Sequence, residues 1–117
     1  MAKFNTDQGE INVSSNVYTT IAGMAASNCF GVKGMAVRSM TDGLVHLLRK
    51  EAAGKGVLVT FHPNGEISID LHIIVDHGIN ISAVGEAIIS EVRYVVTKTT
   101  ETTVRSVNVF VDAIMVG

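Results

Sequence analysis

The clearest pattern of hydrophobic and polar positions lies in the middle of the chain, where two different periods follow one another. From 65 to 76 the apolar residues occupy alternate positions, which is typical of a strand with one face against a core. These positions are Ile67, Ile69, Leu71, Ile73 and Val75. From 81 to 96 they recur every three or four residues, which predicts a helix with one apolar stripe, capped by Asn80 or Ser82. Each face needs the other for burial, so we expect the strand and the helix to pack together.

Shorter patterns predict the elements before this pair. A brief alternation predicts a strand at 10–13, and the polar residues 1–9 are expected to be loosely ordered. A helix follows, with Ser14 or Ser15 as its N-cap. Its predicted apolar stripe consists of Val17, Ile21, Met24, Ala25 and Cys29.

The segment after this helix predicts a second, shorter helix. Residues 35–37 can form a short extended piece, and Asp42 can then cap a helix that carries the apolar positions of 44–48. Arg49 and Lys50 fall in its last turn, where positive charge suits the negative end of the helix dipole.

The remaining pattern predicts a hairpin and a final strand. Residues 57–61 form a strand, and the turn at 62–65 contains an Asn-Gly pair that favours positive φ angles, so this strand is expected to pair antiparallel with the long one. The threonine-rich stretch 97–103 is poor helix material and is expected to let the chain turn. A last strand follows at 104–116.

The order strand, helix, helix, strand, strand, helix, strand predicts an α+β fold, with a small mixed or antiparallel sheet and helices packed mainly on one face. We expect 117 residues to form a single domain, 1–117, that buries its core without a metal or a disulfide. Cys29 is the only cysteine, which excludes an intrachain disulfide and favours a reducing cytosol.

Charge and hydropathy narrow the class of partner. A net charge of -2 and a pI near 6.0 disfavour a broad surface for nucleic acid or anionic membrane. No apolar stretch approaches the roughly 18 residues of a membrane span, so we expect no direct insertion. Mean hydropathy is nevertheless +0.36, and only 17% of residues are charged, against about 25% in typical domains. We therefore expect a homo-oligomer or partner interface, at the edge of the final strand and at Ile74, Phe110 and Ile114.

Polar residues on the long strand offer candidate chemistry. Asp70 and His72 share a face and could orient an imidazole or bind a metal, and Asp76 and His77 close the same strand. No recognisable spacing supplies a third ligand or a nucleophile, and alternating polar residues are expected on the open face of a strand. There is no glycine-rich phosphate loop. The sequence therefore predicts no catalytic, metal or cofactor site, and no enzyme.

One short motif favours a different function. Gly31, Val32, Lys33 and Gly34 form a GxxG segment between two predicted helices, which is how KH domains hold a nucleic-acid backbone. A glycine after a helix is also common in ordinary turns, and no run of Lys and Arg lies beside the motif. A KH-like RNA-binding module is thus the alternative hypothesis.

Several segments together resemble the alkaline-shock-protein family, also called the Gls-type envelope stress response proteins. The similar segments run across nearly the whole chain: Ser14-Ser15-Asn16-Val17, Gly31-Val32-Lys33-Gly34-Met35, Gly56-Val57-Leu58-Val59, the strand from Ile67 to Gly78, and Val107-Asn108-Val109-Phe110-Val111. Within the family, Leu47-Leu48-Arg49-Lys50-Glu51 after Asp42-Gly43 is similar to a branch encoded beside dihydroxyacetone-kinase-like fatty-acid kinase subunits in Gram-positive bacteria.

The resemblance implies a cytoplasmic bacterial protein of cell-envelope homeostasis, not a known enzyme, held near the membrane through a membrane-anchored partner. It names no catalytic residues. The kinase-adjacent branch adds a link to a fatty-acid kinase system, and with it the alternative of an accessory protein in fatty-acid or lipid metabolism. Together with the apolar composition, it predicts a non-enzymatic protein that acts by self-association and by docking to partner proteins.

Overall fold

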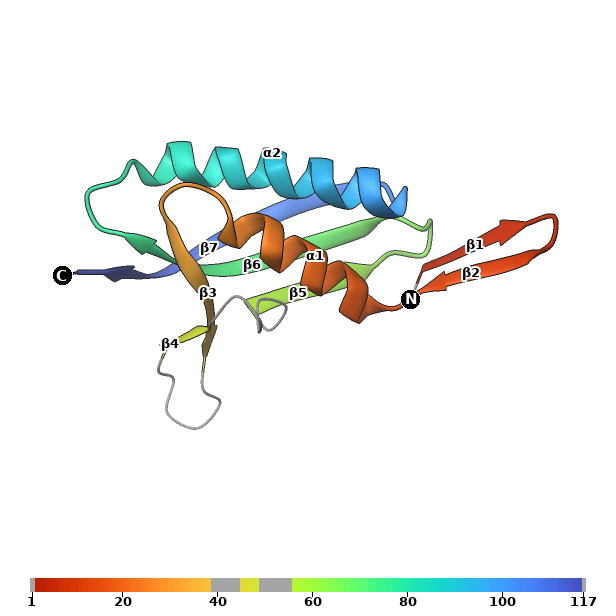
Figure 1. The fold of residues 1–117 in the computed structure, drawn as a ribbon, viewed down its shortest axis with the longest axis horizontal. Coiled ribbons are helices and arrows are strands. Elements are labelled where there is room, and N and C mark those ends of the chain that lie inside the picture. The colour runs from red at the N-terminus through yellow and green to blue at the C-terminus, as the bar shows by residue number, and fades with distance from the viewer. Residues whose placement is uncertain (1, 39–44, 49–55, 117) are drawn as a thin grey trace.

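Two helices cover one face of a five-stranded sheet in the computed structural model, which describes residues 2–38, 45–48 and 56–116 (Figure 1). A separate two-stranded sheet precedes them. The elements are β1 (Ala2–Thr6), β2 (Gly9–Val13), α1 (Ser15–Ser27), β3 (Val32–Arg38), β4 (Val45–Leu48), β5 (Val57–Phe61), β6 (Ile67–Asp76), α2 (Ile81–Thr100) and β7 (Val104–Met115).

The long strand β6 lies at the centre of the larger sheet. One of its edges pairs antiparallel with β5 along its first half and with β3 along its second, and β4 extends the sheet beyond β3. Its other edge pairs parallel with β7 along the whole strand. The sheet is therefore mixed and the helices lie on one side, which confirms the predicted α+β fold.

The core lies between β6 and the helices, as the two periods predicted. Ile67, Ile69, Leu71, Ile73 and Val75 are all fully buried on one face of β6. The buried stripe of α2 is formed by Val84, Ile88, Val92 and Val96. Burying one large aliphatic side chain stabilises a fold by about 1.5–3 kcal/mol, so these buried faces contribute strongly to the stability of the domain.

Helix α2 begins as predicted and ends later than predicted. The Asn80 side chain accepts a hydrogen bond from the Ala83 amide at 3.0 Å, so Asn80 is the cap. The threonine-rich stretch does not stop the helix, which continues to Thr100, and the Thr100 hydroxyl donates to the Val96 carbonyl at 2.7 Å. The helix ends at Glu101, which adopts a left-handed conformation.

Helix α1 turns a different face to the core than the predicted stripe. Tyr18, Ala22 and Ala26 are fully buried, whereas Val17 and Met24 are exposed. The Tyr18 and Thr102 hydroxyls share a buried hydrogen bond of 2.7 Å, and the small alanines allow the helix to approach the sheet closely. The predicted stripe is therefore wrong at Val17 and Met24, whereas Ala25 is buried and Ile21 and Cys29 pack against the core partly buried.

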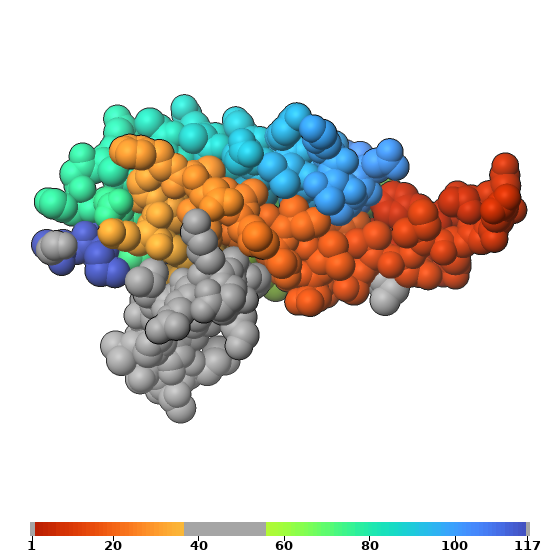
Figure 2. Space-filling view, in the orientation of Figure 1, coloured from red at the N-terminus to blue at the C-terminus, as the bar shows by residue number. Residues whose placement is uncertain are grey.

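The N-terminal residues form a hairpin where we expected loose order. Strand β1 pairs antiparallel with β2, and Figures 1 and 2 show this hairpin projecting from one end of the molecule, in red. Phe4 pairs with Ile11, and Lys3 forms an ion pair with Glu10 at 3.6 Å. Backbone pairing and these side-chain pairs order a segment whose composition is mostly polar.

The predicted short helix at 44–48 is wrong where the structure describes it. Residues 45–48 form β4, which pairs antiparallel with β3. A run of four residues with three aliphatic side chains fits a helix or a strand, and here pairing with β3 decides. Asp42, Arg49 and Lys50 lie outside the described residues.

The predicted hairpin of β5 and β6 is confirmed, with Gly65 alone supplying a positive φ in its turn.

The two N-caps give a matched test of these contacts. Asn80→Ala removes a cap that bonds to an amide, so we expect it to lower the free energy of unfolding by about 1 kcal/mol. Ser14 caps α1 without a side-chain hydrogen bond to the described residues, so Ser14→Ala should change stability by less than about 0.5 kcal/mol. Urea unfolding followed by circular dichroism measures both; equal losses would contradict the assignment.

Candidate interaction surfaces

The GxxG segment is not a loop between two helices. Gly31 occupies the turn after α1 with a φ of 89°, and a Cβ there would lie 3.0 Å from a methyl of Val84. Val32, Lys33 and Gly34 belong instead to β3, which is hydrogen-bonded to β6. The helix-loop-helix placement on which the KH-like hypothesis depends is therefore wrong.

The charge of Lys33 is also engaged within the sheet. Its Nζ lies 3.3 Å from a carboxylate oxygen of Asp76 at the end of β6. The carbonyl of Gly31 accepts a hydrogen bond from the Asp76 amide at 2.9 Å, so the same two segments are joined twice. These contacts give the motif a structural role at the junction of β3 and β6.

The polar residues of β6 lie on the face of the sheet away from the helices, and each has its own partner. His72 Nδ1 lies 3.0 Å from an oxygen of Asp112, and the ring stacks on Phe110 with centroids 4.8 Å apart. Asp70 accepts a hydrogen bond of 2.9 Å from the Asn108 amide group. Asp70 and His72 therefore share a face, as predicted, without contacting each other in a dyad. Among the described residues, no three potential metal ligands converge.

The three residues predicted for an interface lie in different surroundings. Ile74 is only 4% exposed, whereas Phe110 and Ile114 are 44% and 50% exposed. An irregularity in β7 leaves Asp112 as an extra residue, so that Ala113 pairs with Ile74 and Ile114 pairs with Val75. Phe110 and Ile114 were predicted to share one face, which this β-bulge makes wrong. A role of these residues in an interface stays a prediction.

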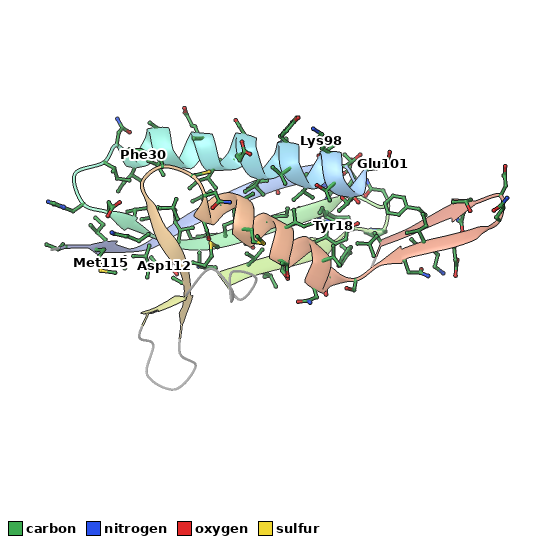
Figure 3. The ribbon with its side chains drawn as sticks, viewed as in Figure 1. Tyr18, Phe30, Lys98, Glu101, Asp112 and Met115 are labelled. Atoms are coloured by element: carbon green, nitrogen blue, oxygen red, sulfur yellow. The ribbon has the colours of Figure 1, made fainter. Side chains whose placement is uncertain are left out.

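An apolar groove of about 650 Å³ runs between α1 and α2. Sequence reasoning placed part of its wall in the core. Met24 is 52% exposed there, and Phe30 is 88% exposed at the turn between α1 and β3 (Figure 3). The groove is lined by Ile21, Met24, Ala25, Asn28, Cys29 and Phe30 from the first helix and its turn, and by Ala87, Glu91, Val95 and Thr99 from the second.

Cys29 lies half-buried in this groove. Burial raises the pKa of its thiol, and the negative charge of Glu91 raises the pKa further. The thiol donates to the Ala25 carbonyl at 3.4 Å. A thiol that stays protonated is a poor nucleophile, so Cys29 is part of an apolar wall, as its position on a helical stripe predicted.

A second groove, of about 470 Å³, follows the outer edge of β7 under the flank of α2. Its walls include Gly85, Glu86 and Ile89 from the helix and residues 107–111 from the strand. In the described part of the chain, β7 pairs with β6 alone, so its other edge is not covered by a strand. The sequence predicted this edge as a place for contact.

Comparison with known proteins gives one family and several relatives. The model of the alkaline shock protein 23 family, described as having a cell envelope-related function, matches residues 3–116. The uncharacterized protein YloU of Bacillus subtilis is 38% identical, over 97% of this chain and 95% of its own length. The uncharacterized protein Spy1614 of Streptococcus pyogenes is also 38% identical, over 97% of this chain and 94% of its own length.

One solved structure, titled MamM CTD H264E, is similar at 18% sequence identity with a TM-score of 0.48, covering 83% of this chain and 92% of that one. Neither helix in the described residues has the length and apolar character required to cross a bilayer.

The raised pKa of Cys29 predicts slow alkylation. We expect iodoacetamide to label Cys29 in the folded protein with a pH midpoint above that of a free thiol. Glu91→Gln removes the nearby negative charge, so it should lower the thiol pKa and speed labelling at pH 8. The same protein unfolded in urea is the control. Identical pH profiles for the folded and unfolded chains would contradict the environment described for Cys29.

Proposed function

The chain belongs to the alkaline shock protein 23 family, and from that premise we propose that it serves the bacterial cell envelope without catalysing a reaction, by self-association and by docking to partner proteins. Such a role needs surfaces that lose water on contact and does not need a reaction centre. Docking to a partner held in the membrane would keep a cytoplasmic domain at the periphery of that membrane.

The observation that carries this proposal is the apolar groove between α1 and α2. The large side chains of Phe30 and Met24 are exposed to water there. Exposed apolar patches of this kind, bordered by polar residues, are typical of protein contact sites. A groove between two helices suits a helix or an extended segment of another protein.

The lining of the groove indicates the chemistry of the partner. Glu91 is the charged side chain among the lining residues, and it lies between apolar neighbours. A segment with two or three apolar anchors and one Lys or Arg would bury those anchors and place its cation against Glu91. We therefore propose an apolar, weakly basic segment of an envelope protein as the occupant.

The polar residues on the open face of the sheet have structural contacts of their own. The imidazole of His72 is fixed by stacking on Phe110 and by its bond to Asp112, two residues of the neighbouring strand. These contacts tie β6 to β7 on the uncovered face. The presence of His72 and Asp112 is therefore explained by the stability that these contacts give to the sheet.

Substitution of a groove residue tests the proposal. Met24→Lys puts a charge into the apolar wall, so we expect the partner captured from the membrane fraction by the wild type to bind at least about tenfold more weakly. Leu58→Lys is the matched control, since Leu58 is 60% exposed, against 52% for Met24, but lies on β5, on the opposite face of the sheet. It should leave capture unchanged.

Protection of Cys29 shows whether the captured protein occupies the groove. A bound partner should slow alkylation of Cys29, which lines the groove. In the Met24→Lys variant, the same partner should no longer slow this alkylation. Equal capture by Met24→Lys and the wild type, or unchanged labelling, would overturn groove docking. Native mass spectrometry that finds a co-purified acyl chain would instead favour the accessory role in fatty-acid or lipid metabolism and its link to a fatty-acid kinase.

A further inference from the structure

We propose that the self-association occurs along β7, which pairs antiparallel with β7 of a second copy around a two-fold axis at Val109. This inference deepens the proposed function and rests on its self-association. It specifies the edge, the register and the charges that meet across the interface, and it is independent of the groove between α1 and α2.

Backbone hydrogen bonds show which groups of β7 are available. The carbonyl of Glu66 accepts a hydrogen bond from the His62 amide at 2.9 Å, so the backbone of Glu66 points toward β5. The amide of the next residue, Ile67, donates to the Thr103 carbonyl at 3.0 Å, so Ile67 points to the opposite edge, toward β7. Residues along a strand alternate in this way, so Ile69 and Leu71 also face β7. In the observed register this turns the amide and carbonyl groups of Val107, Val109 and Val111 outward, away from β6.

The middle of β7 lacks the features that usually protect an edge strand. Residues 106–111 contain no charged residue and no proline, and β-branched and aromatic side chains predominate. The irregularities of the strand fall outside this stretch, at Arg105 and Asp112. The result is a regular, uncharged edge six residues long.

Two-fold symmetry and the position of the regular stretch together select the register. When two copies extend one sheet with the helices on the same side, each residue must face one whose side chain points to the same face. Val109 on the axis meets this condition and places Val107 opposite the second copy's Val111. All three outward-facing residues would then exchange pairs of backbone hydrogen bonds.

Helix α2 places a second contact on the same axis. Ile89 and Val109 line the same groove, and both lie about 16 Å from the turn that joins α2 to β7, at 1.5 Å per helical residue and 3.3 Å per strand residue. The axis through Val109 therefore passes beside Ile89 and brings the two α2 helices together antiparallel. Gly85 leaves open space on this flank for the approach.

Charges on this flank complement those of a second copy. Glu86 precedes Ile89 by three residues, and Arg93 follows it by four; both side chains are exposed. Arg93 lies toward the edge of the sheet, since its guanidinium donates to the Val104 carbonyl. Antiparallel helices centred at Ile89 place Glu86 against the second copy's Arg93, and the reverse, so two ion pairs flank the axis.

Charge reversal tests this arrangement by sedimentation velocity. We expect the wild type to dimerise with rising concentration. Glu86→Arg and Arg93→Glu should each self-associate at least about tenfold more weakly, because like charges then meet at both pairs. An equimolar mixture of the two variants should form heterodimers, because each Glu then faces an Arg. Lys98→Glu, an exposed reversal on the far flank of α2, is the control and should dimerise as the wild type does.

A backbone variant gives a second measurement. Val109→Pro removes an outward amide that β6 does not use, so circular dichroism should stay unchanged while the dimer is lost. If this variant unfolds, the mixing experiment decides. Dimers unaffected by either charge reversal, or not restored by mixing, would overturn the β7 interface and leave self-association in place. A wild type that stays monomeric would overturn both.

Discussion

Burial of one face of β6 is the constraint on which the rest of the structure depends. Five aliphatic side chains on that face need cover, and α1 and α2 together supply it. Both helices are used on the same side, so the opposite face and the edge of β7 lack helical cover in the described residues. The hydrogen bond between Tyr18 and Thr102 fixes how α1 docks, and thereby which of its side chains are left in the groove beside α2.

The sequence predicted the parts of the fold whose periodicity is long. The alternation in β6 lasts ten residues, and the apolar stripe in α2 lasts about five turns. Patterns of this length leave little ambiguity about whether the segment is a strand or a helix, or about which side chains point to the core. Short or weakly patterned segments were harder, and β4 was mistaken for a helix because four residues fit either period. In α1 the larger residues Val17 and Met24 suggested the face that packs on the core. The buried face instead carries Tyr18, whose hydroxyl is hydrogen-bonded, and the smaller Ala22 and Ala26.

For the candidate surfaces, composition predicted that a contact surface exists, but the sequence did not predict its geometry. Low charge and high hydropathy predict a contact surface, and its location on the final strand stays a prediction. The facing of Ile114 was not predictable, because one extra residue at Asp112 reverses the alternation beyond it. Likewise, Glu86 and Arg93 look like ordinary surface charges in the sequence. Their relation to Val109 depends on how α2 folds back over β7, which is a property of the tertiary structure.

The projecting hairpin of β1 and β2 has a practical consequence for hydrodynamic work. The radius of gyration is 14.9 Å, above the about 13 Å of a compact chain of this length, and the molecule measures 55 × 32 × 24 Å. An elongated particle experiences more friction than a sphere of equal mass. On a gel-filtration column calibrated with globular standards, the protomer will therefore elute early, with an apparent mass above its true 12.4 kDa.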